Sequence, residues 1–253
     1  MTQEDKIYTA CMIVIGDEIL SGRTRDANLA WIAVQLNEIG VRLREARVIP
    51  DVEATIVDTV NEARGRFDYV FTSGGIGPTH DDITADAIAK AFGVAIEVHP
   101  EAVARMQARF GFGEMTPARL RMARIPAGAS LIDNPVSQAP GFRIENVFVM
   151  AGIPAIMQAM FNGFRDQLVG GLPLRSRTIG AFVTEGQIAA ALGQLQEKYA
   201  DVAIGSYPFQ REGRYGTSIV IRGTDLTRLG AAAADYIVLV RDLGAEVLED
   251  ILN

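Results

Sequence analysis

Two adjacent aspartates follow a glycine-rich turn in the stretch FTSGGIGPTHDDITADAIAKAFG, residues 71–93. Glycine-rich turns at helix starts usually bind phosphates, because free backbone N–H groups and the helix dipole both favour an anion. Asp81 and Asp82 would repel a phosphate unless a cation lay between them. A divalent metal held by one or two carboxylates and by phosphate oxygens removes this conflict. It would also lower the pKa of a bound water and make that water a nucleophile toward phosphorus. The turn therefore predicts a phosphate ligand together with Mg²⁺, Mn²⁺ or Co²⁺.

The same turn lacks the signatures of two common nucleotide-binding loops. SGGIGPTHDD contains no G-x-x-x-x-G-K-[ST] motif and no G-x-G-x-x-G motif. Neither ATP hydrolysis by a P-loop nor NAD-linked hydride transfer has a positive signal here.

Apolar runs and helix signals alternate along the first two thirds of the chain. YTACMIVIG is a nearly unbroken apolar run, as expected for a strand that is covered on both faces. The order strand–helix, repeated three times, predicts a parallel, doubly wound sheet with right-handed crossovers. The expected elements are strands 8–16, 41–49, 67–72 and 147–152, helices opened by Asp26, Asp51 and Pro154, a helix over 81–92, two helices within 100–124, and a segment 129–142 that is mostly loop.

The sequence VGGLPLRS, residues 169–176, is typical of a linker. A smaller βαββα pattern follows it, with strands 177–183, 202–209 and 215–222 and helices 184–199 and 224–242. The fold class is therefore α/β, a doubly wound, mostly parallel sheet over 1–170 followed by a small α+β domain over 175–253. The final EVLEDILN either adds an edge strand or frays.

Polar residues and glycines gather where the predicted parallel strands end. Ligands bind outside the carboxyl ends of strands in open parallel sheets, so these residues should share one crevice. They are Gly16, Asp17, Glu18 and Asn28 after the first strand, Asp51 after the second, Ser73, Gly74, Gly75, Gly77, Thr79, His80, Asp81 and Asp82 after the third, and Asn134, Ser137 and Gly152 later.

Structural roles are open for several of these side chains. Asp51 is well placed to cap the helix that follows it, and Asp81 can cap the helix over 81–92. Asp17 and Glu18 can form a solvated turn, and His80 can be a polar loop residue.

Bulk properties exclude some classes of function. The formal net charge is −7 and no cluster of Lys and Arg offsets it, so nucleic acid is not expected as a partner. Cys11 is the only cysteine, so an internal disulfide is impossible. No apolar run approaches the roughly 20 residues needed to span a bilayer. The polar, acidic first ten residues do not form a secretory signal. We therefore expect a cytoplasmic protein without membrane contact.

Four stretches together resemble the MoaB/MogA-type molybdopterin-binding domain superfamily and, more narrowly, the amino-terminal part of the competence/damage-inducible protein A (CinA) family. They are IGDEILSGRTRDAN (15–28), TSGGIGPTHDDITADAIAKAFG (72–93), IPAGASLIDNPVSQAPGF (125–142) and AGIPAIMQAMF (151–161). GGIGPTHDD is also similar to the molybdopterin-binding-like domain of eukaryotic FAD synthases. The resemblance extends to the last part of the chain, because 177–250 is similar to the small domain that follows in CinA proteins.

The resemblance implies two different activities. Relatives in the pterin pathway bind molybdopterin, and some transfer an adenylyl group to it. The CinA-like branch is associated with metal-dependent hydrolysis of pyrophosphate bonds in dinucleotides such as ADP-ribose, and the FAD synthase domain with hydrolysis of FAD. Two aspartates matter in the molybdopterin adenylyltransferases, and motif position places them at Asp51 and Asp82. Such relatives often self-associate, which implies a homo-oligomer.

Three positions depart from the family pattern. His80 stands where CinA proteins often have lysine, so a fixed positive charge near the phosphates is missing. Ile156 stands where a glutamate is common, and Ala151 replaces the first proline of the usual Pro-Gly-x-Pro motif.

The leading hypothesis is metal-dependent hydrolysis of the pyrophosphate bond of a dinucleotide such as ADP-ribose or FAD. Asp51 and Asp82 are the candidate catalytic residues, and Asp17, Asp81 and Asp82 the candidate metal ligands. The candidate substrate contacts are Gly16, Asn28, Ser73, Gly74, Gly75, Gly77, Thr79, His80 and Ser137. Two alternatives remain: molybdopterin as the ligand, either bound or adenylylated, and a regulatory module that binds a nucleotide without converting it.

Overall fold

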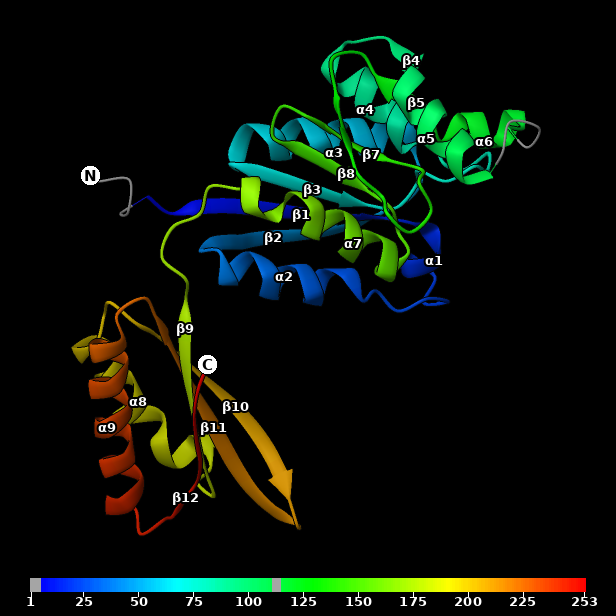
Figure 1. Cartoon of the computed structure of the whole chain (residues 1–253). Helices are drawn as coiled ribbons and strands as arrows, with labels where there is room; N and C mark the ends of the chain where they lie inside the picture. The colour runs from blue at the N-terminus through cyan, green and yellow to red at the C-terminus, as the bar shows by residue number, and fades with distance from the viewer. Residues whose placement is uncertain (1–5, 111–114) are drawn as a thin grey trace. The chain divides into compact units, whose positions relative to one another are not determined.

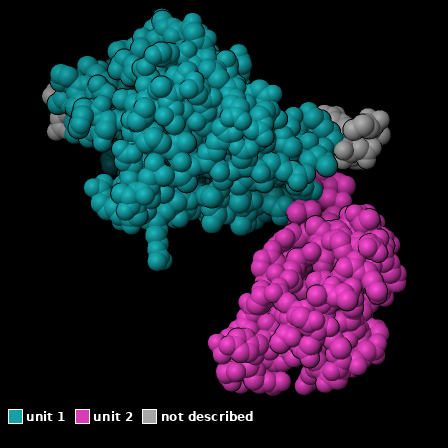
Figure 2. Space-filling view, turned by 180° about the vertical axis from the view of Figure 1, so that it is seen from behind, with its two compact units in different colours: residues 1–171 teal, residues 172–253 magenta. Residues whose placement is uncertain are grey.

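A computed structural model of the protein describes residues 6–110 and 115–253. The chain forms two compact units, Met1–Gly171 and Leu172–Asn253, shown in different colours in Figure 2. The division between them falls inside the segment 169–176 that the sequence predicts as a linker. None of the described helices is long and apolar enough to cross a membrane.

A six-stranded sheet forms the centre of the larger unit, in the order β2-β1-β3-β8-β7-β6 (Figure 1). Its first four strands are parallel, whereas at one edge β7 pairs antiparallel with β8 and β6 pairs antiparallel with β7. The mostly parallel sheet predicted from the sequence is confirmed. The strands are β1 (Tyr8–Ile15), β2 (Val41–Ile49), β3 (Tyr69–Ser73), β6 (Ser130–Ile132), β7 (Gly141–Ile144) and β8 (Val147–Met150).

Helices cover both faces of this sheet, which explains the continuous apolar run of β1. Cys11 and Ile13 face the core shared with α3 and α4, whereas Met12 and Val14 face the core shared with α2 and α7. The helices of this unit are α1 (Asp17–Leu20), α2 (Asn28–Glu38), α3 (Glu53–Arg66), α4 (Thr84–Phe92), α5 (Pro100–Phe110), α6 (Pro117–Arg121) and α7 (Pro154–Phe164), with a 3₁₀ turn at Arg165–Gln167.

Two parts of the larger unit differ from the prediction. The segment 129–142, predicted as mostly loop, contains β6 and the start of β7, and a two-stranded sheet pairs β4 (Ile96–Val98) with β5 (Arg124–Pro126). These strands have three or four residues each, too few for alternation of apolar residues to be detected. The helix expected over 81–92 begins only at Thr84, whose N–H donates to the carbonyl oxygen of Gly75.

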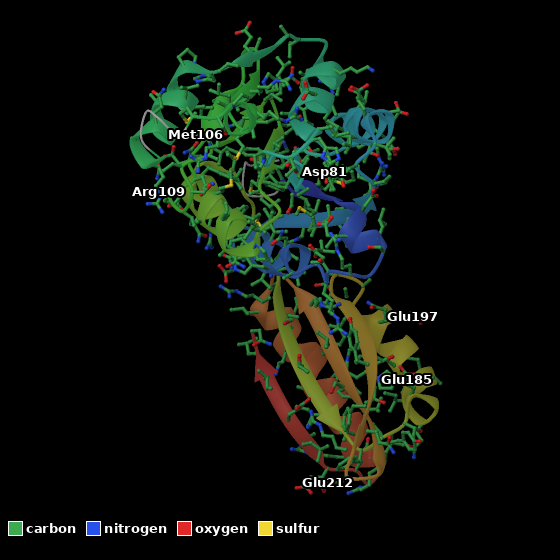
Figure 3. All side chains as sticks on the ribbon, turned by 90° about the vertical axis from the view of Figure 1, so that its right-hand side faces the viewer. Asp81, Met106, Arg109, Glu185, Glu197 and Glu212 are labelled. Atoms are coloured by element: carbon green, nitrogen blue, oxygen red, sulfur yellow. The ribbon has the colours of Figure 1, made fainter. Side chains whose placement is uncertain are left out.

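The smaller unit is an antiparallel sheet with two helices on one face. Its strand order is β10-β11-β9-β12, and the hairpin between β10 and β11 ends at Glu212 (Figure 3). The buried side chains of α8 and α9 form one core with the inward side chains of β9 and β11. The elements are β9 (Arg175–Ala181), α8 (Glu185–Lys198), β10 (Ala203–Arg211), β11 (Arg214–Gly223), α9 (Leu226–Asp242) and β12 (Val247–Leu252).

The final residues EVLEDILN contain an edge strand, β12, which is one of the two alternatives that the sequence allowed. β12 pairs antiparallel with β9, and Ser176 and Asn253 exchange two backbone hydrogen bonds of 3.0 and 2.8 Å. The first strand of this unit therefore lies beside its last.

A side-chain cap holds the start of α9. The Asp225 carboxylate accepts hydrogen bonds from the backbone N–H groups of Thr227 and Arg228, at 2.7 and 3.2 Å. We expect Asp225→Ala to lower the free energy of unfolding by about 1 kcal/mol, because two N–H groups lose their acceptor. Urea denaturation measures this effect. Asp225→Asn keeps an acceptor oxygen, so a similar loss in both variants would contradict the capping role.

Candidate active site at the carboxyl edge of the parallel sheet

A cleft of about 560 Å³ opens where β1, β2, β3 and β8 end. Its walls come from the loops that follow these four strands and from the loop around Asn134. Sequence reasoning predicts a shared crevice at this edge, and the loops do converge there. Such a volume accommodates a ligand of nucleotide or pterin size.

The glycine-rich turn after β3 forms the floor of the cleft. Gly74 has φ +113° and Gly75 has φ +69°, and a Cβ at Gly74 would lie 2.1 Å from the carbonyl oxygen of Ile15. Both positions therefore require glycine. In the part of the chain that the structure describes, the backbone N–H groups of Gly75, Ile76 and Gly77 have no hydrogen-bond acceptor. Successive N–H groups of this kind form a concave site for an anion.

Four carboxylates line the same cleft. They belong to Glu18, Asp51, Asp81 and Asp82, and Asp81 is labelled in Figure 3. The described residues that line the cleft include no Lys, Arg or His. Free backbone N–H groups and carboxylates thus occur in one cavity.

Asp51 does not cap the helix that follows it. α3 begins at Glu53 without a side-chain cap, and the Asp51 Oδ2 atom instead accepts a hydrogen bond from the backbone N–H of Asp17 at 3.0 Å. Burial raises the pKa of Asp51 above its ordinary value of 3.8, and the nearby charges of Asp17 and Glu18 raise it further, whereas the hydrogen bond lowers it. The structural alternative for Asp51 is therefore wrong.

A raised pKa makes the Asp51 carboxylate a cost to stability at neutral pH. As the pH rises above about 4, the unfolded chain loses this proton first, so the free energy of unfolding falls until the folded protein has lost it too. We expect Asp51→Asn, in the presence of chelator, to be at least as stable to urea as the wild type at pH 7. The difference should disappear toward pH 4. Asp58→Asn, an exposed change on α3, serves as the control, and equal pH profiles for all three proteins would contradict the interpretation.

Asp82 is held by the loop that precedes it. The Thr79 backbone N–H and hydroxyl both donate to Asp82 Oδ2, at 2.8 and 2.5 Å, and a Cβ at Gly77 would lie 2.6 Å from this same oxygen. The carboxylate therefore lies directly against the glycine turn. Asp81 does not cap α4, since that helix has no side-chain cap.

Some of the other predicted substrate contacts line the cleft and others do not. Gly16 and Ser137 line the cleft, and the Asn134 side chain orders the Ser137 loop by accepting from the N–H groups of Val136 and Ser137. The His80 imidazole is 99% exposed and does not line the cleft.

Asn28 and Ser73 lie deeper in the protein. They line a cavity of about 60 Å³ that shares Glu18 and Gly152 with the cleft. The Asn28 Nδ2 atom donates to Ser73 Oγ at 2.7 Å and to the Gly152 carbonyl at 2.8 Å, while its Oδ1 is buried without a partner. Asn28 thus connects the ends of β3 and β8.

The carboxylates fit a metal site that has few protein ligands better than one in which protein side chains enclose the ion. Within residues 6–110 and 115–253, no three Asp, Glu, His or Cys side chains are arranged to enclose a metal ion. Of the predicted ligands, Asp81 and Asp82 line the cleft and Asp17 does not. The donor set therefore fits an ion such as Mg²⁺ that takes one or two carboxylates and completes its shell with phosphate and water.

One charged residue beside the turn has no counterpart in the sequence prediction. Arg121, at the end of α6, donates from Nη2 to the carbonyl oxygen of Asp82 at 3.3 Å. Because 39 residues separate it from Asp82 in the sequence, no local sequence pattern indicates this contact. The sequence around Arg121, LRMARIP, contains no motif that distinguishes it from a solvated arginine.

Fold and site together define an α/β protein with an acidic, glycine-lined cleft at the carboxyl edge of a mostly parallel sheet. A family model described as "Probable molybdopterin binding domain" matches residues 11–169, and a model of the FAD synthase middle domain matches residues 173–245. The chain belongs to the molybdopterin-binding domain family, and a region similar to the FAD synthase middle domain follows in it.

Individual relatives cover different shares of the chain. A protein of Pyrobaculum calidifontis is 36% identical over 79% of this chain and 80% of its own length. The Caenorhabditis elegans protein named "Probable FAD synthase" is 34% identical over 84% of this chain, which spans 46% of that relative. The crystal structure of the protein CinA from Thermoplasma acidophilum, described as of unknown function, covers 64% of this chain and 98% of its own, with 34% identity and a TM-score of 0.61.

Proposed function

We propose that the larger unit hydrolyses the pyrophosphate bond of a dinucleotide such as ADP-ribose or FAD and requires a divalent cation. The observation that carries this proposal is the meeting of three free N–H groups and four carboxylates in a cleft whose described lining residues include no basic side chain. Only a ligand that brings phosphate and cation together satisfies both sets of groups.

Each group has a role in this proposal. The N–H groups of Gly75, Ile76 and Gly77 bind oxygens of one phosphate. Asp82, with Asp51, would hold the divalent ion. When bound, this ion supplies charge neutralisation and a bound water of lowered pKa. The oxygen of water forms a bond to one phosphorus while the bridging P–O bond breaks, and two phosphate monoesters leave.

The test measures AMP release from ADP-ribose and from FAD with Mg²⁺, Mn²⁺ or Co²⁺. We expect AMP in the presence of a metal and none after chelation, because the carboxylates would otherwise repel the phosphates. AMP release that is equal with and without chelator would contradict the metal requirement. If one of these nucleotides stabilises the protein against heat but no AMP is released, the result would instead indicate a regulatory module that binds the nucleotide without converting it.

The family match supports a second candidate function. Because residues 11–169 match the molybdopterin-binding domain model, the cleft is also a candidate site for the phosphate of a pterin, as a ligand or an acceptor of an adenylyl group. Pterin fluorescence that copurifies with the protein, together with no AMP release, would favour this function over hydrolysis.

A further inference from the structure

Arg121 lies beside the glycine turn, in a notch that borders the acidic cleft. Its side chain lines a narrow notch whose wall includes Gly75, Gly77 and Asp82, and these three residues also line the cleft. The turn therefore borders both a cavity with four carboxylates and a notch that contains a guanidinium group.

The guanidinium group of Arg121 is poorly satisfied by the protein. Its Nε atom is buried without a hydrogen-bond partner, and its Nη2 atom donates only to the Asp82 backbone carbonyl. Within the described residues Arg121 forms no ion pair. Its neighbour in the notch, Arg124, differs, because two of its nitrogens donate to the Asp86 carboxylate at 3.0 and 2.5 Å.

A guanidinium group with unused donors next to three free N–H groups has a definite preference for ligands. Its planar array of N–H donors matches two oxygens of a phosphate, and a charged acceptor gives stronger hydrogen bonds than a backbone carbonyl does. Arg121 does not line the cleft itself, but it lies beside the turn that does, and the described cleft residues provide no positive charge.

We propose that Arg121 binds the phosphate group that rests on the Gly75–Gly77 turn and so supplies the positive charge that the turn itself lacks. This inference rests on the proposed function, because it assigns a residue to the same phosphate site. Arg121 acts as a substrate-binding residue. Its hydrogen bond to Asp82 places it within reach of the loop that carries the proposed catalytic carboxylate.

The test uses inorganic pyrophosphate with Mg²⁺ as the probe and isothermal titration calorimetry as the measurement. We expect Arg121→Ala to weaken binding by about 10- to 100-fold, because a charge-assisted hydrogen bond is lost. Arg121→Gln should lose as much, since its shorter amide side chain carries no charge. Arg121→Lys should fall between these variants and the wild type. Arg109→Ala, an exposed change on α5 (Figure 3), should bind like the wild type.

A bracing role without ligand contact predicts a different result. In that case Arg121→Ala would lower the free energy of unfolding in urea but bind pyrophosphate as the wild type does, and this outcome would overturn the proposal, as would a wild type that does not bind pyrophosphate. Because inorganic pyrophosphate binding is measured without a dinucleotide, it is independent of AMP release. If the protein releases no AMP but needs Arg121 to bind pyrophosphate, the hydrolysis is contradicted and the anion site is supported. If it releases AMP but binds pyrophosphate equally well without Arg121, only the role of Arg121 is contradicted.

Discussion

Asp82→Asn is expected to reduce AMP release by about 100- to 10,000-fold while the protein stays folded. Asparagine keeps the shape of the side chain, and its amide oxygen still accepts the two hydrogen bonds from Thr79. What it removes is the negative charge that would hold a divalent ion beside the glycine turn. Stopped assays with ADP-ribose and FAD at saturating metal measure the loss of activity.

The matched control for Asp82→Asn is the same change at Asp58, an exposed residue on α3 in the same unit. Asp58→Asn should leave AMP release unchanged. Urea denaturation of both variants separates a loss of activity from a loss of fold. Wild-type activity in a folded Asp82→Asn protein would remove Asp82 from the proposed mechanism.

Gly74→Ala is expected to cause the largest loss of stability of the changes considered. A residue at φ +113° is strained unless it is glycine, and the new Cβ would lie 2.1 Å from the Ile15 carbonyl oxygen, which belongs to the neighbouring strand and cannot move freely. The two effects cost about 1–3 kcal/mol each. Their sum is a large part of the 5–15 kcal/mol typical of whole domains. The free energy of unfolding in urea is the quantity to measure.

Gly93→Ala provides the comparison for Gly74→Ala. Gly93 also has positive φ, +65°, but nothing lies within 4 Å of a Cβ placed there. It should therefore show only the cost of the left-handed backbone, about 1–2 kcal/mol. Equal losses at Gly74 and Gly93 would mean that the contact with Ile15 does not restrict the turn.

The main sheet could be predicted because its central strands are buried on both faces. The continuous apolar run of β1 identifies such a strand without further information, and the helices between strands then fix a parallel order. β6 and β7 carry no comparable signal. These two segments form strands because β7 pairs with β8 and β6 pairs with β7, which is a tertiary effect.

The candidate site could be predicted in its composition but not in its hydrogen bonds. Strand ends and glycines indicate where Asp51 and Asp82 lie, because parallel strands bring their carboxyl ends to one edge. The sequence does not show that Asp51 accepts a hydrogen bond from Asp17 and leaves α3 uncapped. Arg121 was missed for a similar reason, since its contact with Asp82 depends on how two distant loops meet.

The place of β9 in the smaller unit bears on how this part of the chain is made. β9 comes first in the sequence, yet both of its neighbours in the sheet, β11 and β12, come later, and its pairing with β12 joins Arg177 to Leu252. Contacts of such high sequence separation are slow to form because they close long loops. During translation, one edge of β9 is therefore without its partner until β12 has been made, and an unpaired strand edge of this kind favours aggregation.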